Sequence, residues 1–183
     1  MRQSDFMFKT KMQLAKYAIE YFLDHQQLPQ FQPDQVKKEL TKKIACFVTI
    51  YIDKKIRGCV GNYIAHEPLC VSIIKNAINA AFFDSRFLPI EKEELPKLKI
   101  KISLLTRLKK YQPKSINQLL QYLKKNKPGL LIETNNRKAL FLPQVWEQLP
   151  KQDEFLSELC LKAGLPFSFW KEGKLNYWIF NIY

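Results

Sequence analysis

Glycine, cysteine and histidine are scarce in this chain, with five, four and two among its 183 residues. The sequence has no Walker loop, no glycine-rich dinucleotide-binding turn, no H-E-x-x-H motif and no radical-SAM cysteine triplet. Phosphate binding by a glycine-rich loop and zinc-peptidase chemistry are therefore excluded.

The few cysteines are irregularly spaced, at Cys46, Cys59, Cys70 and Cys160, and no Cys-x-x-Cys pair occurs. With His25 and His66 as the only histidines, the spacing fits neither a closed zinc site nor an iron–sulfur cluster. We therefore expect no metal and no cofactor. Unpaired thiols are typical of a reducing compartment, so we expect a cytoplasmic protein.

Long apolar runs are also missing, so no membrane span is expected. Residues 1–20 mix charged and apolar side chains and do not resemble a secretion signal. Hydrophobic residues make up 46% of the chain, and folding at this length hides roughly 70% of the unfolded surface. We expect one domain over residues 1–183, with a small second lobe as an alternative.

Arginine is rare as well, although the net charge is +13. Five of the 30 basic residues are Arg, and the lysines are scattered as pairs such as Lys42-Lys43 and Lys124-Lys125. Such a charge would allow phosphate contacts, so a basic nucleic-acid-binding module is one hypothesis. The scattered lysines favour a solvated surface and a codon bias instead.

Helical and strand periods alternate along the chain. Helical spacing predicts helices over residues 8–25, 69–83, 115–125 and about 152–163, the last ended by Gly164. Alternating or β-branched runs predict strands over residues 44–52, 56–64, 97–106, 129–133, 138–142 and 175–183, with turns at Asp53-Lys54 and Asn135-Asn136. Because hairpins dominate, we predict an α+β fold, with helices packed on a mostly antiparallel sheet.

Several segments carry a family resemblance. The runs Ala45–Ile50 and Ile56–Gly61, the latter containing Arg57-Gly58-Cys59-Val60-Gly61, resemble the hallmark of the AMMECR family. Further similar blocks follow in the same order, at residues 76–87, 94–95, 103–106, 140–146 and 162–166. The chain is thus identified as similar to this family over about residues 40–170.

What the resemblance implies is a protein of unestablished activity. In many prokaryotes the family appears as protein A of the AmmeMemoRadiSam system, so a Memo-like protein and a radical-SAM protein are the implied partners. The chain departs from the family pattern at Ser85, where Pro is usual, and over residues 62–68.

The same run contains the candidate site. On a regular strand Arg57 and Cys59 share a face, and a guanidinium beside a thiol would favour the thiolate of a nucleophilic cysteine. Gly58 and Gly61 would let a ligand or another backbone approach closely. The structural alternative is a small core cysteine, an ion-paired arginine and glycines at a bulge. A two-residue turn would place Cys59 opposite Val48, and Cys46 opposite Gly61, too far apart for a disulfide.

Four other residues are candidates for the site. Asp84 and Arg86 would bind substrate or clamp their loop, and His66 would act as a base toward Cys59. Glu133 would supply an acid near Arg57, or simply face solvent. The favoured hypothesis is a binding or catalytic-accessory domain, with a cleft around Arg57, Cys59 and Asn62. The enzymatic alternative uses Cys59 as a nucleophile.

Overall fold

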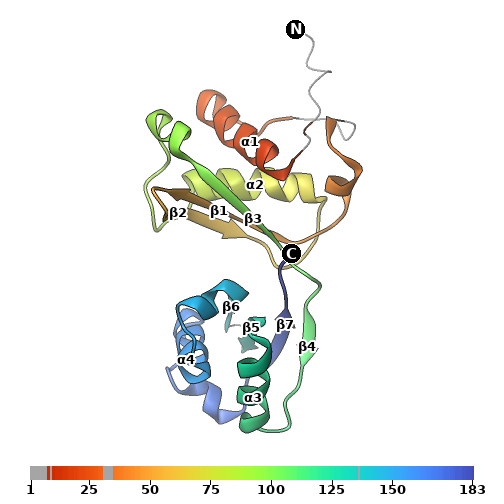
Figure 1. The fold of residues 1–183 in the computed structure, drawn as a ribbon, viewed down its shortest axis with the longest axis vertical. Coiled ribbons are helices and arrows are strands. Elements are labelled where there is room, and N and C mark those ends of the chain that lie inside the picture. The colour runs from red at the N-terminus through yellow and green to blue at the C-terminus, as the bar shows by residue number, and fades with distance from the viewer. Residues whose placement is uncertain (1–7, 9, 31–34, 136) are drawn as a thin grey trace. The chain divides into compact units, whose positions relative to one another are not determined.

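The chain forms two compact units, residues 1–104 and 105–183. The computed structural model describes residues 8, 10–30, 35–135 and 137–183, and Figure 1 shows the elements of each unit. Each unit has its own sheet and its own hydrophobic core, and each is described separately below. No change in composition marks the boundary at residues 104–105.

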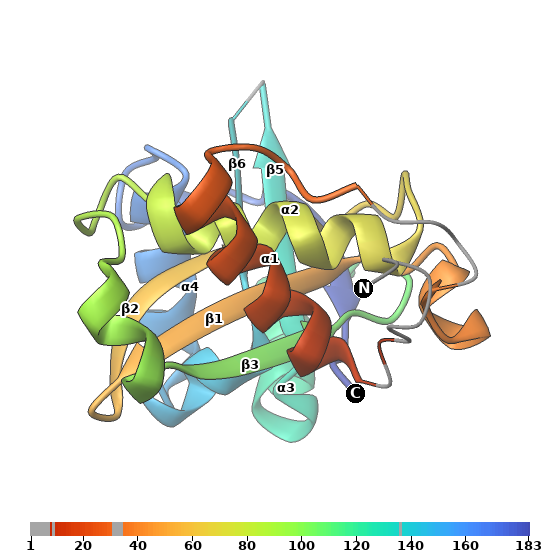
Figure 2. The same ribbon diagram turned by 90° about the horizontal axis from the view of Figure 1, so that it is seen from above.

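Unit 1 is a three-stranded antiparallel sheet with two helices on one face. Its elements are α1 (Lys11–His25), η3 (Lys38–Thr41), β1 (Cys46–Ile52), β2 (Lys55–Gly61), α2 (Leu69–Phe82), η4 (Lys92–Lys97) and β3 (Lys99–Leu104). The strand order is β2-β1-β3, so β2 is an edge strand. Seen from above, α1 and α2 both lie over this sheet (Figure 2).

Local signals explain the helices of unit 1. The side chain of Thr10 accepts a hydrogen bond from the backbone of Gln13, and the Gln13 side chain returns one, which forms a capping box at the start of α1. Apolar side chains of α2 such as Ile73 and Ala77 are fully buried, and they pack with Val48 and Ile50 of β1. The predicted helices over residues 8–25 and 69–83 are confirmed with slightly shorter bounds.

The β1–β2 hairpin contains a bulge that changes the predicted register. Asp53 and Lys54 form the turn, with φ angles of 49° and 66°. Tyr51 pairs with Ile56, but Ile50 pairs with Gly58, so Arg57 is an extra residue in β2. The predicted pairing of Cys59 with Val48 and of Cys46 with Gly61 is therefore wrong. Cys59 pairs with Thr49, and Gly61 pairs with Phe47.

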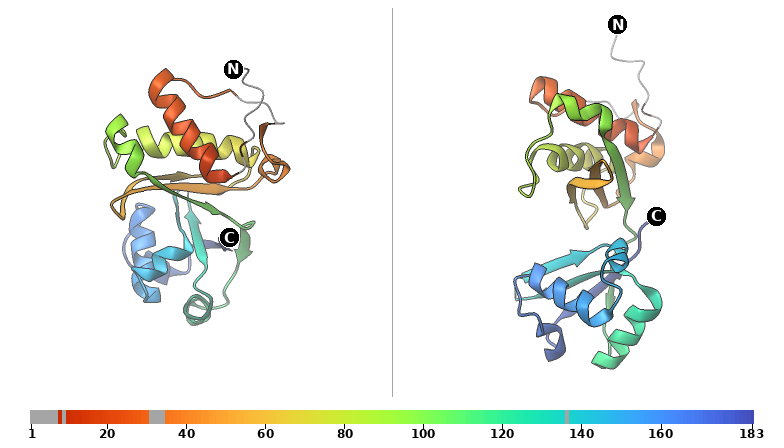
Figure 3. Two further views of the ribbon diagram at one scale, coloured as in Figure 1. Left: turned by 45° about the horizontal axis from the view of Figure 1, so that its top comes forward. Right: turned by 60° about the vertical axis from the view of Figure 1, so that its left-hand side comes forward.

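Unit 2 is a four-stranded antiparallel sheet in the order β4-β7-β5-β6. Its elements are β4 (Lys109–Tyr111), α3 (Ile116–Asn126), β5 (Gly129–Thr134), β6 (Arg137–Phe141), η5 (Pro143–Glu147), α4 (Gln152–Lys162), η6 (Phe169–Glu172) and β7 (Asn176–Phe180). Both helices pack on the same side of the strands (Figure 3, right). In the core the Trp146 and Phe155 rings stack at 3.7 Å, and the indole of Trp146 donates to the carbonyl of Pro128.

The predicted α+β class, with antiparallel strands built from hairpins, is confirmed. The strands form two sheets, and β4, which is only three residues long, was not predicted. Asn136, of the turn predicted at Asn135-Asn136, lies outside the described residues. No helix within the described ranges has both the length and the apolar character needed to cross a membrane.

Candidate functional site

The run from Arg57 to Gly61 lies on β2, and α2 packs closely against it. A Cβ atom added to Gly58 would lie 1.9 Å from the carbonyl oxygen of Ala80 in α2. One added to Gly61 would lie 2.2 Å from the ring of Phe47. Both glycines are therefore required for close packing of this unit's own chain, and at Gly58 the close neighbour is another backbone, as was expected of these glycines.

Arg57 is held by four hydrogen bonds that reach across to the segment before β3. Its Nε and Nη2 atoms donate to the two carboxylate oxygens of Glu94, at 2.9 and 3.0 Å. Its Nη1 atom donates to the carbonyl of Leu88, and Nη2 also donates to that of Pro89, at 3.1 Å. Burial acts to raise the pKa of Glu94, but the Arg57 guanidinium holds it below its usual value. This bidentate pair clamps the 88–94 segment onto the bulge of β2.

Asp84 and Arg86 bind the backbone of Cys59 from the outer side of β2. The Asp84 carboxylate accepts from the Cys59 amide at 2.9 Å, and Arg86 Nη2 donates to the Cys59 carbonyl at 3.1 Å. The two side chains also pair with each other, with Arg86 Nε and Nη2 at 2.9 and 2.7 Å from the two carboxylate oxygens. This arginine fork, aided by the Cys59 amide and opposed by burial, lowers the pKa of Asp84 to about 2.

The Cys59 thiol shares a hydrogen bond with the Thr49 hydroxyl at 3.1 Å. Thr49 and Cys46 are three residues apart on β1, so their side chains point to opposite faces of the sheet. The Cys59 thiol lies on the same face as Thr49, and therefore not on the face of Cys46. All four cysteines are free, and Cys59 is the one that is not buried. Burial raises the pKa of Cys46 to about 11, and it also raises the pKa values of Cys70 and Cys160.

Two asparagines order the chain that follows β2. The buried side chain of Asn76, on α2, donates to the carbonyl of Cys46 at 3.1 Å and to the side-chain oxygen of Asn62 at 3.0 Å. Asn62 in turn donates to the carbonyl of Ile64 at 2.7 Å. The predicted site residue Asn62 therefore belongs to a network that joins β1, α2 and the loop after β2.

The structure brings together some predicted site residues and not others. Arg57, Cys59, Asp84 and Arg86 meet along β2, and Arg86, not Arg57, is the guanidinium that contacts Cys59. His66 is exposed in the loop before α2, while the thiol bonds to Thr49. The acid that pairs with Arg57 is Glu94, whereas Glu133 lies on β5 of unit 2, opposite Lys138.

Three side chains of this region were given no role from the sequence: Thr49, Asn76 and Glu94. Each lies in a block that resembles the AMMECR pattern, which was the signal available for finding them. Among the described residues, no three His, Cys, Asp or Glu side chains are grouped to hold a metal ion.

These observations define a class of protein: an antiparallel α+β fold whose Arg-Gly-Cys strand is held by the Arg57–Glu94 and Asp84–Arg86 pairs. The profile of the AMMECR1 family matches residues 12–182, and the chain belongs to that family. The resemblance found in the sequence motifs is thereby confirmed.

Relatives of this chain span most of its length. Protein NEQ441 of Nanoarchaeum equitans is 38% identical over 178 residues, which cover 93% of this chain and 96% of that protein. A protein of Aquifex aeolicus is 32% identical over 176 residues, covering 92% and 86%. The fold is similar to the crystal structure of the uncharacterized protein PH0010 from Pyrococcus horikoshii, with a TM-score of 0.85, 31% identity, and coverage of 94% and 87%.

Proposed function

We propose that this chain is a binding or catalytic-accessory domain that acts with a Memo-like protein and a radical-SAM protein on a small molecule or a modified residue. The observation that carries this proposal is that the charged side chains of the candidate site are engaged in contacts within the protein. Arg57, Asp84 and Arg86 all pair within unit 1 and hold β2 in place. Charged side chains that pair with one another stabilise the strand and are not available for catalysis. This favours a rigid binding platform over a catalytic centre.

On the sheet face opposite α1 and α2, the platform has a row of polar side chains, which we call the polar face. Cys59, Thr49 and Lys101 lie side by side across the three strands there, and Ser103 follows on the same face of β3. The Ser103 hydroxyl is buried and has no hydrogen-bond partner among the described residues. Because Thr49 and Ser103 are buried, the half-buried Cys59 and the exposed Lys101 are the members of this row that are open to a partner.

The cysteine-dependent alternative rests on one observation, the partial exposure of Cys59 among otherwise buried cysteines. The hydrogen-bond partner of its thiol is the Thr49 hydroxyl, which is not a base at neutral pH. The accessory role is therefore the better supported of the two.

The proposal is tested by titrating the full chain with the purified Memo-like and radical-SAM proteins of the same genome in a calorimeter. We expect a saturable complex with at least one of them, retained by Cys59→Ser and weakened by Lys101→Glu, which reverses a charge on the polar face. Lys42→Glu, an equal charge change outside the sheet, is the matched control and should bind normally. Absence of any complex would refute the accessory role, and loss of a measured activity in Cys59→Ser would favour the nucleophile.

A further inference from the structure

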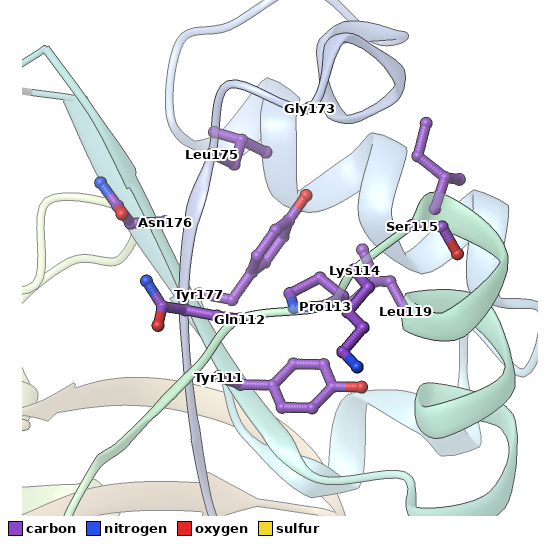
Figure 4. A pocket seen from close by; sticks show the side chains of 11 residues that line it. Tyr111, Gln112, Pro113, Lys114, Ser115, Leu119, Gly173, Leu175, Asn176 and Tyr177 are labelled. Atoms are coloured by element: carbon purple, nitrogen blue, oxygen red, sulfur yellow. The ribbon is translucent and has the colours of Figure 1, made fainter.

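Unit 2 contains a pocket of about 370 Å³ beside the start of α3. Its walls come from three segments: the end of β4 with the loop that follows it, the first turn of α3, and the stretch from Gly173 into β7. Figure 4 shows the rings of Tyr111 and Tyr177 and the side chains of Lys114, Leu119 and Leu175 around this space. The family motif on β2 belongs to unit 1, so this pocket and the site proposed above have no residue in common.

Tyr177 gives the pocket a buried polar group. The residue is only 5% exposed, and no hydrogen bond of its hydroxyl is found among the described residues. Burial raises the pKa of Tyr177 to about 12, so the hydroxyl keeps its proton and can donate. The residue lines the pocket, and its hydroxyl has no partner in the described part of the chain to compete with a ligand for its hydrogen bond.

Two further groups of the pocket are electropositive, the first turn of α3 and Lys114. Ser115 caps the 11-residue helix α3 by accepting from the backbone of Gln118, and Ile116, the first residue of the helix, lines the pocket. The N–H groups of a first helical turn have no partner within the helix and carry a partial positive charge. Lys114 adds a full positive charge, and none of the 11 lining residues carries a carboxylate.

The remaining wall combines apolar surface with the neutral amides of Gln112 and Asn176. Leu119 and Leu175 contribute aliphatic surface, and the ring of Tyr111 is fixed by stacking on Tyr122 at 4.4 Å. Aliphatic and aromatic surface beside a small number of polar groups is the usual composition of a small-molecule site.

We propose that this pocket binds a small molecule that joins an apolar, ring-sized portion to one carboxylate or phosphate group. The anionic group is bound by Lys114, the first turn of α3 and the hydroxyl of Tyr177. The apolar portion packs on Leu119, Leu175 and Tyr111.

The test uses the full chain and three probes of one shape: phenyl phosphate, benzoate and the neutral benzyl alcohol. Binding is followed by the ¹H–¹⁵N shifts of the Ser115 and Ile116 amides. We expect saturable shifts with at least one anion at concentrations up to about 10 mM, and none with benzyl alcohol. Saturation by phenyl phosphate alone identifies a phosphate site, and saturation by benzoate alone identifies a carboxylate site.

Two variants test the assigned contacts. Tyr177→Phe removes only the hydroxyl and should weaken anion binding about tenfold, as expected for a hydrogen bond to a charged group. Lys114→Ala should weaken it severalfold at low salt and less at high salt. The matched controls are Tyr183→Phe, at an exposed tyrosine, and Lys124→Ala, at the other end of α3, and both should bind as the parent does. Equal binding of benzyl alcohol, no saturable shift with any probe, or unchanged affinity in both pocket variants would overturn the proposal.

Discussion

At the scale of single residues, the four cysteines differ in their access to solvent. Cys46, Cys70 and Cys160 are buried with raised pKa values, and Cys59 is partly exposed. We expect a maleimide added to the native protein at pH 7 to modify Cys59 first and the other three only after unfolding, because both access and thiolate fraction limit the rate. Peptide mass mapping at timed intervals measures this order. A Cys59 no faster than Cys160 would contradict it and would also remove the nucleophile hypothesis.

Asp84 leads to a prediction about pH. Its pKa is lowered to about 2, so it contributes stability above its ordinary value of 3.8, and that contribution is lost as the pH falls toward 2. We expect Asp84→Asn to lower the free energy of unfolding by about 1–2 kcal/mol at pH 7, reduced from the full value because Arg86 is solvent-screened. Urea unfolding at several pH values should show the difference from the parent shrinking between about pH 4 and pH 2.

Asp24→Asn is the control for Asp84→Asn, because Asp24 is exposed and lies 3.6 Å from Lys92. It should change the stability by less than about 0.5 kcal/mol. A constant effect of Asp84→Asn across this pH range would show that its charge is not what stabilises β2.

The sequence indicated that Arg57, Cys59, Asp84 and Arg86 belong together, because the family-like blocks contain them. It did not predict which atoms meet. Arg57 and Glu94 are 37 residues apart, and their pairing depends on a bulge. That bulge is adjacent to Gly58 of β2, which lies close to the Ala80 carbonyl of α2. No local sequence pattern reveals such a contact between two elements.

At the scale of elements, the contact of β2 with α2 depends on Gly58. A methyl group there would lie 1.9 Å from a backbone oxygen, which cannot rotate away as a side chain can. We expect Gly58→Ala to lower the free energy of unfolding by about 3 kcal/mol, since overpacking forces strand and helix apart. Denaturant titration followed by circular dichroism measures this change.

Gly164→Ala is the control for Gly58→Ala, because it introduces backbone strain without steric crowding. Nothing lies within 4 Å of a Cβ atom at Gly164, but its φ of 71° disfavours any side chain. Its cost should be about 1 kcal/mol. If Gly58→Ala costs no more than this control, the packing of α2 on β2 is looser than the structure indicates.

Periodicity predicted most elements, because α1, α2 and the two hairpins have a buried face with a regular spacing. It failed for β4, whose Lys109, Lys110 and Tyr111 are too few to show an alternation. β4 exists because its backbone pairs with β7, about 70 residues further along the chain. Such a strand is determined by its partner and not by its own sequence.

At the scale of the whole molecule, the two hydrophobic cores consist of separate sets of residues. Phe155 is fully buried in the core of unit 2, where it stacks on Trp146. We expect Phe155→Ala to destabilise unit 2 by about 3–5 kcal/mol and to raise amide hydrogen exchange mainly over residues 105–183. Equal loss of protection over residues 1–104 would show that both units unfold in one cooperative step.

The fold class could be predicted, whereas the division into two sheets could not. Each hairpin was visible in the sequence, but the choice of further neighbours, such as β1 with β3 and β5 with β7, is made by contacts over long separations. The boundary at residues 104–105 follows directly on a strand and contains no Pro or Gly, so it lacks the usual mark of a linker.

The contacts of Asp84 and Arg86 with Cys59 have a consequence for how this protein meets other chains. An edge strand offers unpaired N–H and C=O groups on which a foreign strand can add, and this is a common start of aggregation. On β2 both groups of Cys59 are already bound by side chains of the same molecule. The pairing of Asp84 and Arg86 with Cys59 thus protects the strand against unwanted self-association at this position.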